Sequence, residues 1–96
     1  MRVVKDVDIY VDGERILQDI PLNYEEFDMR SEEPQEITAT AFLPHDDYFT
    51  QGKALVIDFK DGVYAKAKIY ESARLGDEYQ SDMAIVDAGY SLAQLS

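Results

Sequence analysis

The 96-residue chain has no cysteine and no tryptophan. The lack of cysteine excludes disulfide bonds, thiolate zinc sites and cysteine nucleophiles together. It is typical of a reducing compartment, so we expect a cytoplasmic protein or one incorporated in a particle assembled there. Asp6, Asp8, Asp12 and Asp19 leave no apolar signal-peptide core in the first twenty residues. No apolar run approaches the ~20 residues that span a bilayer, so we expect no membrane partner.

Basic residues are scarce. Nine Lys and Arg oppose twenty Asp and Glu, which gives a formal net charge of −11 at pH 7. A surface of this sign repels nucleic acid and anionic lipid. The composition therefore argues against direct nucleic-acid binding. It is compatible with a basic protein partner, with cation binding, or with solubility alone.

The chain also lacks the motifs of common catalytic sites. No glycine-rich phosphate loop occurs, and His45 is the only histidine, which excludes a multi-histidine metal site within one chain. His45 precedes Asp46 and Asp47, a pairing that base catalysis uses, but no Ser or Cys companion is identifiable. We expect a solvated loop there, and we predict a protein with no catalytic, metal-binding or cofactor-binding residues.

Asp8, Tyr10, Asp12 and Gly13, continuing to Asp19, imitate the ligand spacing of a calcium loop. Tyr10 stands where a carboxylate or amide is expected, and the flanking pattern is that of a strand rather than a helix. A hairpin turn at Asp12-Gly13 explains the motif without calcium.

Much of the remaining sequence is patterned as β-structure. With 46% hydrophobic residues, residues 1–96 should fold as a single compact β-rich domain. Apolar and polar residues alternate as they do in strands over residues 3–11, 14–24, 36–43, 53–60 and 63–71. Residues 31–35 indicate an exposed loop and residues 76–78 a turn. Five or six antiparallel strands predict a mainly β fold, a small barrel or a sandwich.

Residues 81–95 leave two alternatives open. A helix capped at Ser81 suits the Ala, Leu and Gln content, but Gly89 in its middle would cost about 1 kcal/mol. The other alternative is a strand over residues 83–87, followed by an irregular or briefly helical end. We favour the strand, with a possible short C-terminal helix after it.

Two hairpins allow the register to be predicted. A two-residue loop at Asp12-Gly13 places Ile9 opposite Ile16, Val7 opposite Gln18 and Lys5 opposite Ile20. Pro21 cannot donate a ladder hydrogen bond, so the second strand should lie at an edge or contain a bulge.

In the later hairpin, apolar pairing selects a three-residue loop at residues 60–62, with Gly62 left-handed. That loop pairs Phe59 with Val63, Ile57 with Ala65 and Leu55 with Ala67.

Two surfaces are candidate partner-binding sites. In this register Tyr64, Lys66, Lys68 and Tyr70 share the outer face of one strand and form the only locally basic stripe. Tyrosine is enriched at interfaces, although such a stripe also serves as ordinary cover for a solvent face. The second surface is the acidic N-terminal third, where alternate carboxylates on a strand lie about 7 Å apart. Its candidate residues are Asp6, Asp8, Glu25, Glu26, Asp28, Glu32 and Glu33.

The sequence therefore predicts a non-enzymatic, acidic protein-interaction or assembly module, whose partner is a protein or its own copies. The alternative is an inhibitor that mimics nucleic acid through the acidic N-terminal third and binds a DNA- or RNA-binding protein. Small size and acidity are also common in phage and mobile-element proteins, but no motif carries that likeness.

Overall fold

The computed structural model describes residues 1–26 and 37–95 and contains six strands and two short 3₁₀ turns. The elements are β1 (Arg2–Val11), β2 (Glu14–Glu25), β3 (Ile37–Pro44), η1 (Asp47–Phe49), β4 (Ala54–Asp58), β5 (Tyr64–Leu75), β6 (Glu78–Gly89) and η2 (Leu92–Gln94). The loop predicted at residues 31–35 lies outside the described residues, as do Asp28, Glu32 and Glu33.

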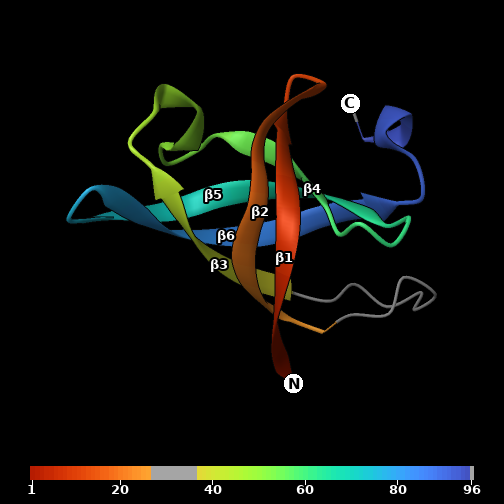
Figure 1. Ribbon diagram of the computed structural model, residues 1–96, viewed down its shortest axis with the longest axis horizontal. Helices are drawn as coiled ribbons and strands as arrows, with labels where there is room; N and C mark the ends of the chain where they lie inside the picture. The colour runs from red at the N-terminus through yellow and green to blue at the C-terminus, as the bar shows by residue number, and fades with distance from the viewer. Residues whose placement is uncertain (27–36, 96) are drawn as a thin grey trace.

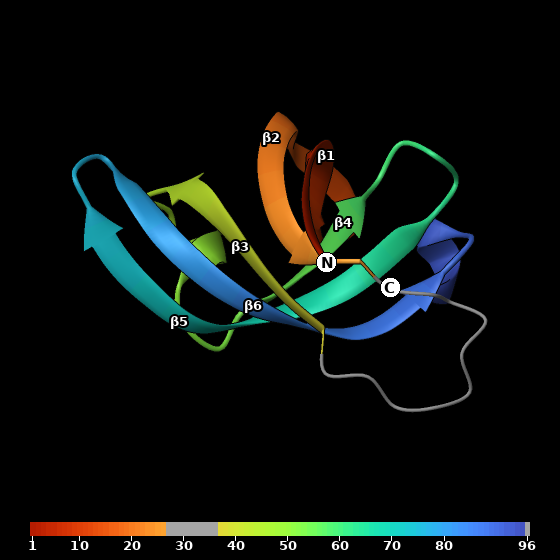
Figure 2. The ribbon, with the colours of Figure 1, turned by 90° about the horizontal axis from the view of Figure 1, so that it is seen from below.

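The six strands form one closed antiparallel barrel in the order β1-β2-β3-β6-β5-β4. It consists of two three-stranded meanders, β1-β2-β3 and β4-β5-β6, joined by the β1–β4 and β3–β6 pairs. In Figure 1, β1 and β2 cross in front of β5 and β6 at a steep angle. Figure 2 shows β5 and β6 curving beneath them as a trough. The mainly β fold is thus confirmed, and closure selects the barrel over the sandwich.

Along each strand, alternate residues point inward and fill the barrel, as the sequence predicts. The fully or nearly fully buried interior side chains are Val7, Ile9, Val11, Leu22, Ala39, Ala41, Leu43, Phe49, Leu55, Ile57, Phe59, Ala65, Ala67, Ile69, Met83 and Ile85. Small alanines stand opposite large residues on neighbouring strands, as in the Leu22–Ala41, Ile57–Ala65 and Ala39–Met83 pairs. Such pairing of small with large side chains suits the close packing of a protein interior.

The β4–β5 hairpin has the predicted register. Ile57 lies opposite Ala65 and Leu55 opposite Ala67, and the Phe59 N–H donates to the Val63 carbonyl. Gly62 has φ +90°, a left-handed conformation that glycine adopts without steric cost. The three-residue loop is confirmed.

The register predicted for β1 and β2 is wrong beyond the turn. Asp12-Gly13 does form a two-residue loop, but Ile9 pairs with Leu17, Val7 with Ile20 and Lys5 with Leu22. Two bulges each insert one extra residue on the β2 side. Together they shift the pairing by two positions, so the apolar face of β2 still points inward.

Bulging of β2 near Pro21 is the irregularity that the proline predicts. Asp19 has φ +54°, and the β2–β3 ladder covers only Leu22 to Tyr24 of β2. Pro21 therefore lies just past the end of that ladder, where β2 has only β1 as a partner.

Residues 78–89 form a strand, followed by the short η2 turn, so the helical alternative for residues 81–95 is wrong. Gly76-Asp77 forms the turn before it, with Leu75 paired to Glu78. Within the described ranges, no helix is long and apolar enough to cross a membrane.

Candidate functional site

The predicted stripe on β5 lies on the outer wall of the barrel. Tyr64 and Lys66 are half-buried and Lys68 and Tyr70 are exposed, while the residues between them, Ala65, Ala67 and Ile69, are fully buried. The alternation that places alanines inside the barrel necessarily places the tyrosines and lysines outside. The structure thus brings the four predicted residues onto one face.

Apolar surface lies beside this stripe on β6. Tyr70 is 48% exposed and Val86 is 59% exposed. With Lys68 and Ala84 they line a shallow hollow of ≈ 380 Å³ on the outer wall. Ala84 lies directly opposite Lys68 in the β5–β6 ladder. Aromatic, aliphatic and cationic side chains therefore adjoin one another across the two strands.

Neither Lys66 nor Lys68 forms an ion pair with another residue in the described part of the chain. Lys66 lies between Val56 and Asp87 in the ladder, and Lys68 between Ala54 and Ala84. Within the described residues, no ion pair therefore neutralises the charge of either lysine.

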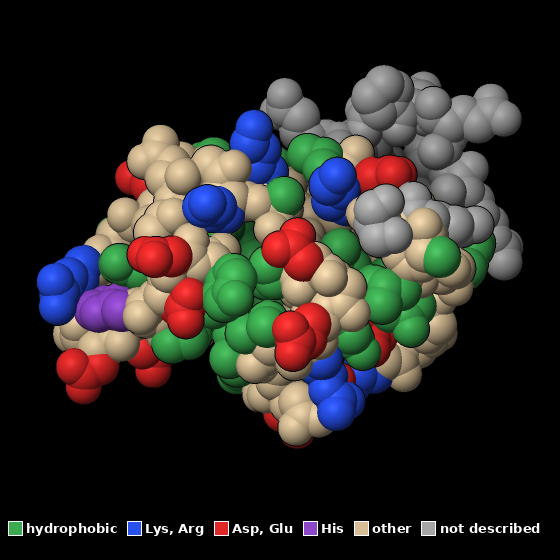
Figure 3. All heavy atoms as spheres, turned by 90° about the horizontal axis from the view of Figure 1, so that it is seen from above, with side chains coloured by type: hydrophobic (Ala, Val, Ile, Leu, Met, Phe, Trp, Pro, Cys, Tyr) green, Lys and Arg blue, Asp and Glu red, His purple; other side chains and the backbone are tan. Residues whose placement is uncertain are grey.

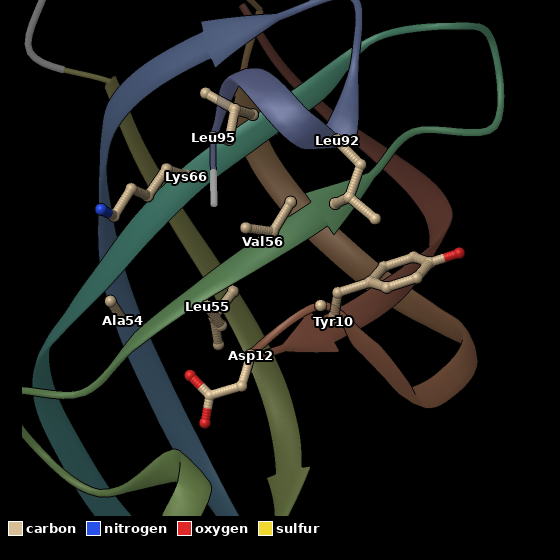
Figure 4. A pocket seen from close by; sticks show the side chains of 9 residues that line it. Tyr10, Asp12, Ala54, Leu55, Val56, Lys66, Leu92 and Leu95 are labelled. Carbon is tan, nitrogen blue, oxygen red and sulfur yellow. The ribbon is translucent and has the colours of Figure 1, made fainter.

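A second hollow, of ≈ 410 Å³, lies at the seam between β1 and β4. These two strands pair over only three residues, from Asp8 to Tyr10 of β1, and then separate. Figure 4 shows Tyr10 and Asp12 on one side of the opening and Ala54, Leu55 and Val56 on the other.

The C-terminal residues cover the outer side of this seam. Leu92 and Leu95 extend over β4 and line the hollow together with Lys66 (Figure 4). Leu95 is buried although it does not belong to the barrel core. The sequence analysis missed this site. Its only sequence signal was the i, i+3 spacing of two leucines after Gly89.

Figure 3 shows the side of the molecule where the β1–β2 turn, η1 and the C-terminal turn lie. Hydrophobic side chains gather in its middle, with acidic and basic side chains scattered among them. This face is accordingly mixed in character rather than uniformly acidic.

Among the acidic candidates that the structure describes, Asp6, Asp8, Glu25 and Glu26, the exposed charges do not form a continuous line. Asp6 is exposed, but Asp8 is buried. Asp8 Oδ1 accepts a hydrogen bond from the Asp19 N–H at 3.0 Å and lies 3.3 Å from the Lys60 ammonium. Arg15 lies 3.8 Å from Asp8 Oδ2. The negative charge of Asp8 is therefore neutralised within the protein by Lys60 and Arg15.

Glu25 is also paired. It accepts a hydrogen bond from the amino group of Met1 at 2.6 Å, and this contact holds the pKa of the Glu25 carboxyl below its usual value. Glu26 is exposed. Asp28, Glu32 and Glu33 lie outside the described residues.

The residues weighed for catalysis and calcium have structural roles. The His45 ring packs against Tyr79 with 4.3 Å between centroids and a tilt of 42°, and the Asp46 side chain caps η1 by accepting from the Tyr48 N–H. Asp12 and Gly13 have φ +52° and +80°, the conformation of a hairpin turn. Within residues 1–26 and 37–95, no three His, Asp or Glu side chains are grouped to hold a metal ion.

Comparison with protein-family models, with curated proteins and with solved structures finds no match to this chain.

Proposed function

We propose that this protein is a non-enzymatic assembly module that joins its own copies or a larger complex through the outer face of β5 and β6. The observation that carries the proposal is the half-exposed pair Tyr70 and Val86 beside Lys68. The barrel has its own buried core, so these side chains are not needed to fill it. Exposed apolar groups rimmed by polar ones are typical of interaction surfaces.

The composition supports the remaining parts of the proposal. The net charge of −11 disfavours direct binding to nucleic acid or to anionic lipid. The lack of cysteine suits a cytoplasmic protein or a particle assembled in the cytoplasm. The partner is thus a protein surface, either another copy or a different chain.

The nucleic-acid mimic is the second candidate. It needs a row of carboxylates that face solvent, whereas Asp8 is enclosed by Lys60 and Arg15. Fewer charges therefore reach a partner than the sequence pattern implies, and we rank this function below assembly.

Replacement of Tyr64 and Tyr70 by Ala tests the assembly function. We expect the double variant to self-associate or bind its complex at least ten-fold more weakly, because aromatic area is lost from the contact. Light scattering from micromolar to millimolar concentration measures the mass, and circular dichroism checks that the sheet is retained. Tyr48→Ala is the matched control, since Tyr48 is 44% exposed and does not line the β5–β6 hollow.

Salt separates the two candidate functions. Apolar contacts are not screened, so assembly should change little between 0.1 M and 1 M salt, where the Debye length falls from about 10 Å to about 3 Å. A nucleic-acid mimic should lose its partner as salt rises over that range. If the protein is such a mimic, a variant with its acids neutralised to Asn or Gln should fail to bind the partner even at low salt. The positions to neutralise are Asp6, Glu25, Glu26, Asp28, Glu32 and Glu33, whereas Asp8 is kept because its contacts with Asp19 and Lys60 stabilise the fold. Partner loss in both cases, with Tyr64→Ala/Tyr70→Ala still binding, would contradict the assembly proposal.

A further inference from the structure

The tip of the β5–β6 hairpin is an exposed apolar projection. β4 pairs with β5 only from Tyr64 to Lys68, whereas β5 continues to Leu75. Leu75, the last residue before the turn, is 57% exposed. Figures 1 and 2 both show this tip at one extreme of the long axis. An aliphatic side chain is thus held by a rigid ladder at the end of the molecule.

The seam hollow lies toward the other end. Both ribbon views place η2 and the C-terminus on the side opposite the hairpin tip (Figures 1 and 2). The hollow has a volume of ≈ 410 Å³, and Val56, Leu92 and Leu95 give it an apolar lining. Projection and hollow are therefore different surfaces that lie apart on a single copy.

The charges around the two surfaces are complementary. Asp77 and Glu78 follow Leu75 in the turn, and Arg74 precedes it. The seam hollow is bordered by Lys66 and by Asp12. Apart from contacts with residues outside 1–26 and 37–95, none of these five charged side chains has an ion-pair partner. Asp77 and Glu78 beside the projection are opposite in charge to Lys66 at the hollow. Arg74 beside the projection is likewise opposite in charge to Asp12 at the hollow.

The geometry points to a head-to-tail contact in which Leu75 of one copy enters the seam hollow of the next copy, with Asp77 and Glu78 beside its Lys66. This inference rests on the proposed assembly function and names the partner as a second copy of the chain. Because the two surfaces differ, the contact is heterologous. Repetition then gives a ring if the rotation closes and a filament if it does not.

Two complementary variants test the contact by light scattering and sedimentation velocity. Leu75→Asp removes the projection but keeps the hollow, and Ala54→Trp fills the hollow at an exposed position but keeps the projection. We expect each variant alone to self-associate at least ten-fold more weakly than the native chain. An equal mixture should associate more tightly than either variant alone, because a mixed pair retains one intact projection and one intact hollow.

Val4→Asp is the matched control, since Val4 is another exposed aliphatic residue on a strand but lies on neither surface. It should associate as the native chain does. Lys66→Glu should weaken association, and mixing it with Asp77→Lys should restore a dimer through the reversed ion pair.

The outcomes separate this contact from the assembly function itself. A native chain that associates, loses association in the Tyr64→Ala/Tyr70→Ala variant and is unaffected by Leu75→Asp would overturn the head-to-tail contact and leave assembly standing. Failure of the Leu75→Asp and Ala54→Trp mixture to associate more tightly than either variant alone would overturn it as well. A native chain that stays monomeric to millimolar concentration would overturn self-assembly altogether.

Discussion

Asp8 is the buried carboxylate among the described residues, and its surroundings determine what it contributes. The Asp19 N–H, freed by the β2 bulge, donates to Asp8 Oδ1. This hydrogen bond lowers the pKa of Asp8 most strongly, burial opposes it, and Lys60 and Arg15 lower the pKa further. Lys60 also bonds to the Asp19 carboxylate, which raises the pKa of Lys60. The contacts among Asp8, Arg15, Asp19 and Lys60 thus connect β1, the β2 bulge and the β4–β5 turn.

Replacement of Asp8 by Asn should lower the free energy of unfolding at pH 7 by about 1–3 kcal/mol, the usual cost of breaking a buried, charged hydrogen-bond network. Urea denaturation measures this difference. Asp6→Asn on the same strand is the control, because Asp6 is exposed and a surface change of this kind stays within about 0.5 kcal/mol. Equal effects of the two substitutions would show that the network does not stabilise the fold.

The effect of Asp8 also depends on pH. Its pKa is lower in the folded protein than the ordinary value of 3.8, so its contribution is fully present above that value. The contribution is lost as pH falls through the lowered folded pKa, because a protonated Asp8 no longer pairs with Lys60. The native chain and Asp8→Asn should therefore converge in stability at acid pH. The Lys60 contribution is lost at the other extreme, above pH 10.5.

At the scale of elements, the β3–β4 connection closes one end of the barrel. The sequence predicted a solvated loop at His45, Asp46 and Asp47, and these three side chains are indeed exposed. Phe49 in η1 is instead fully buried in the core. The Ser72 hydroxyl donates to the Phe49 carbonyl at 3.2 Å, and the Gly52 N–H donates to the Ile69 carbonyl at 2.7 Å. These bonds hold the connection against β5.

Phe49→Ala should lower the free energy of unfolding by about 3–5 kcal/mol, because a large buried ring leaves a cavity that the barrel cannot collapse to fill. Tyr48→Ala, at the adjacent exposed position, should cost less than about 1 kcal/mol. Thermal and urea unfolding of both variants give the comparison. Similar costs for the two variants would show that burial of Phe49 in η1 does not stabilise the barrel.

For the whole molecule, the barrel is closed unequally around its circumference. The β3–β6 seam contains eight paired residues and the β1–β4 seam only three. Leu92 and Leu95 then cover the shorter seam from outside. The C-terminal turn thus covers one of the two shortest ladders of the barrel, the other being the three-pair β2–β3 ladder.

Hydrogen exchange should reveal this difference. Amides of β4 that face β1 should exchange at least ten-fold faster than amides in the β3–β6 ladder, because local opening requires fewer broken contacts there. Leu95→Ala should accelerate β4 exchange further and leave β3–β6 unchanged. Uniform exchange in both seams would contradict a weak β1–β4 closure.

Local pattern alone determined much of the fold. The period-two alternation identified the first five strands, because a strand side chain has only two directions in which to point. The last strand was predicted only over residues 83–87, whereas β6 runs from Glu78 to Gly89. Apolar pairing identified the three-residue loop at Gly62, since a slip of one residue would have turned the hydrophobic face outward. The same alternation identified the outer stripe of Tyr64, Lys66, Lys68 and Tyr70.

Only the tertiary structure decided how these strands close. The two β2 bulges preserve the inward face while shifting the register by two positions, so the apolar pattern cannot distinguish them from an unbulged hairpin. Burial of Asp8 depends on Lys60, which lies 52 positions away in the chain and meets it only because β1 pairs with β4. The seam hollow likewise forms where β1, β4 and the C-terminal turn meet. Contacts between segments so distant in sequence leave no local period, and they exist only once the barrel has closed.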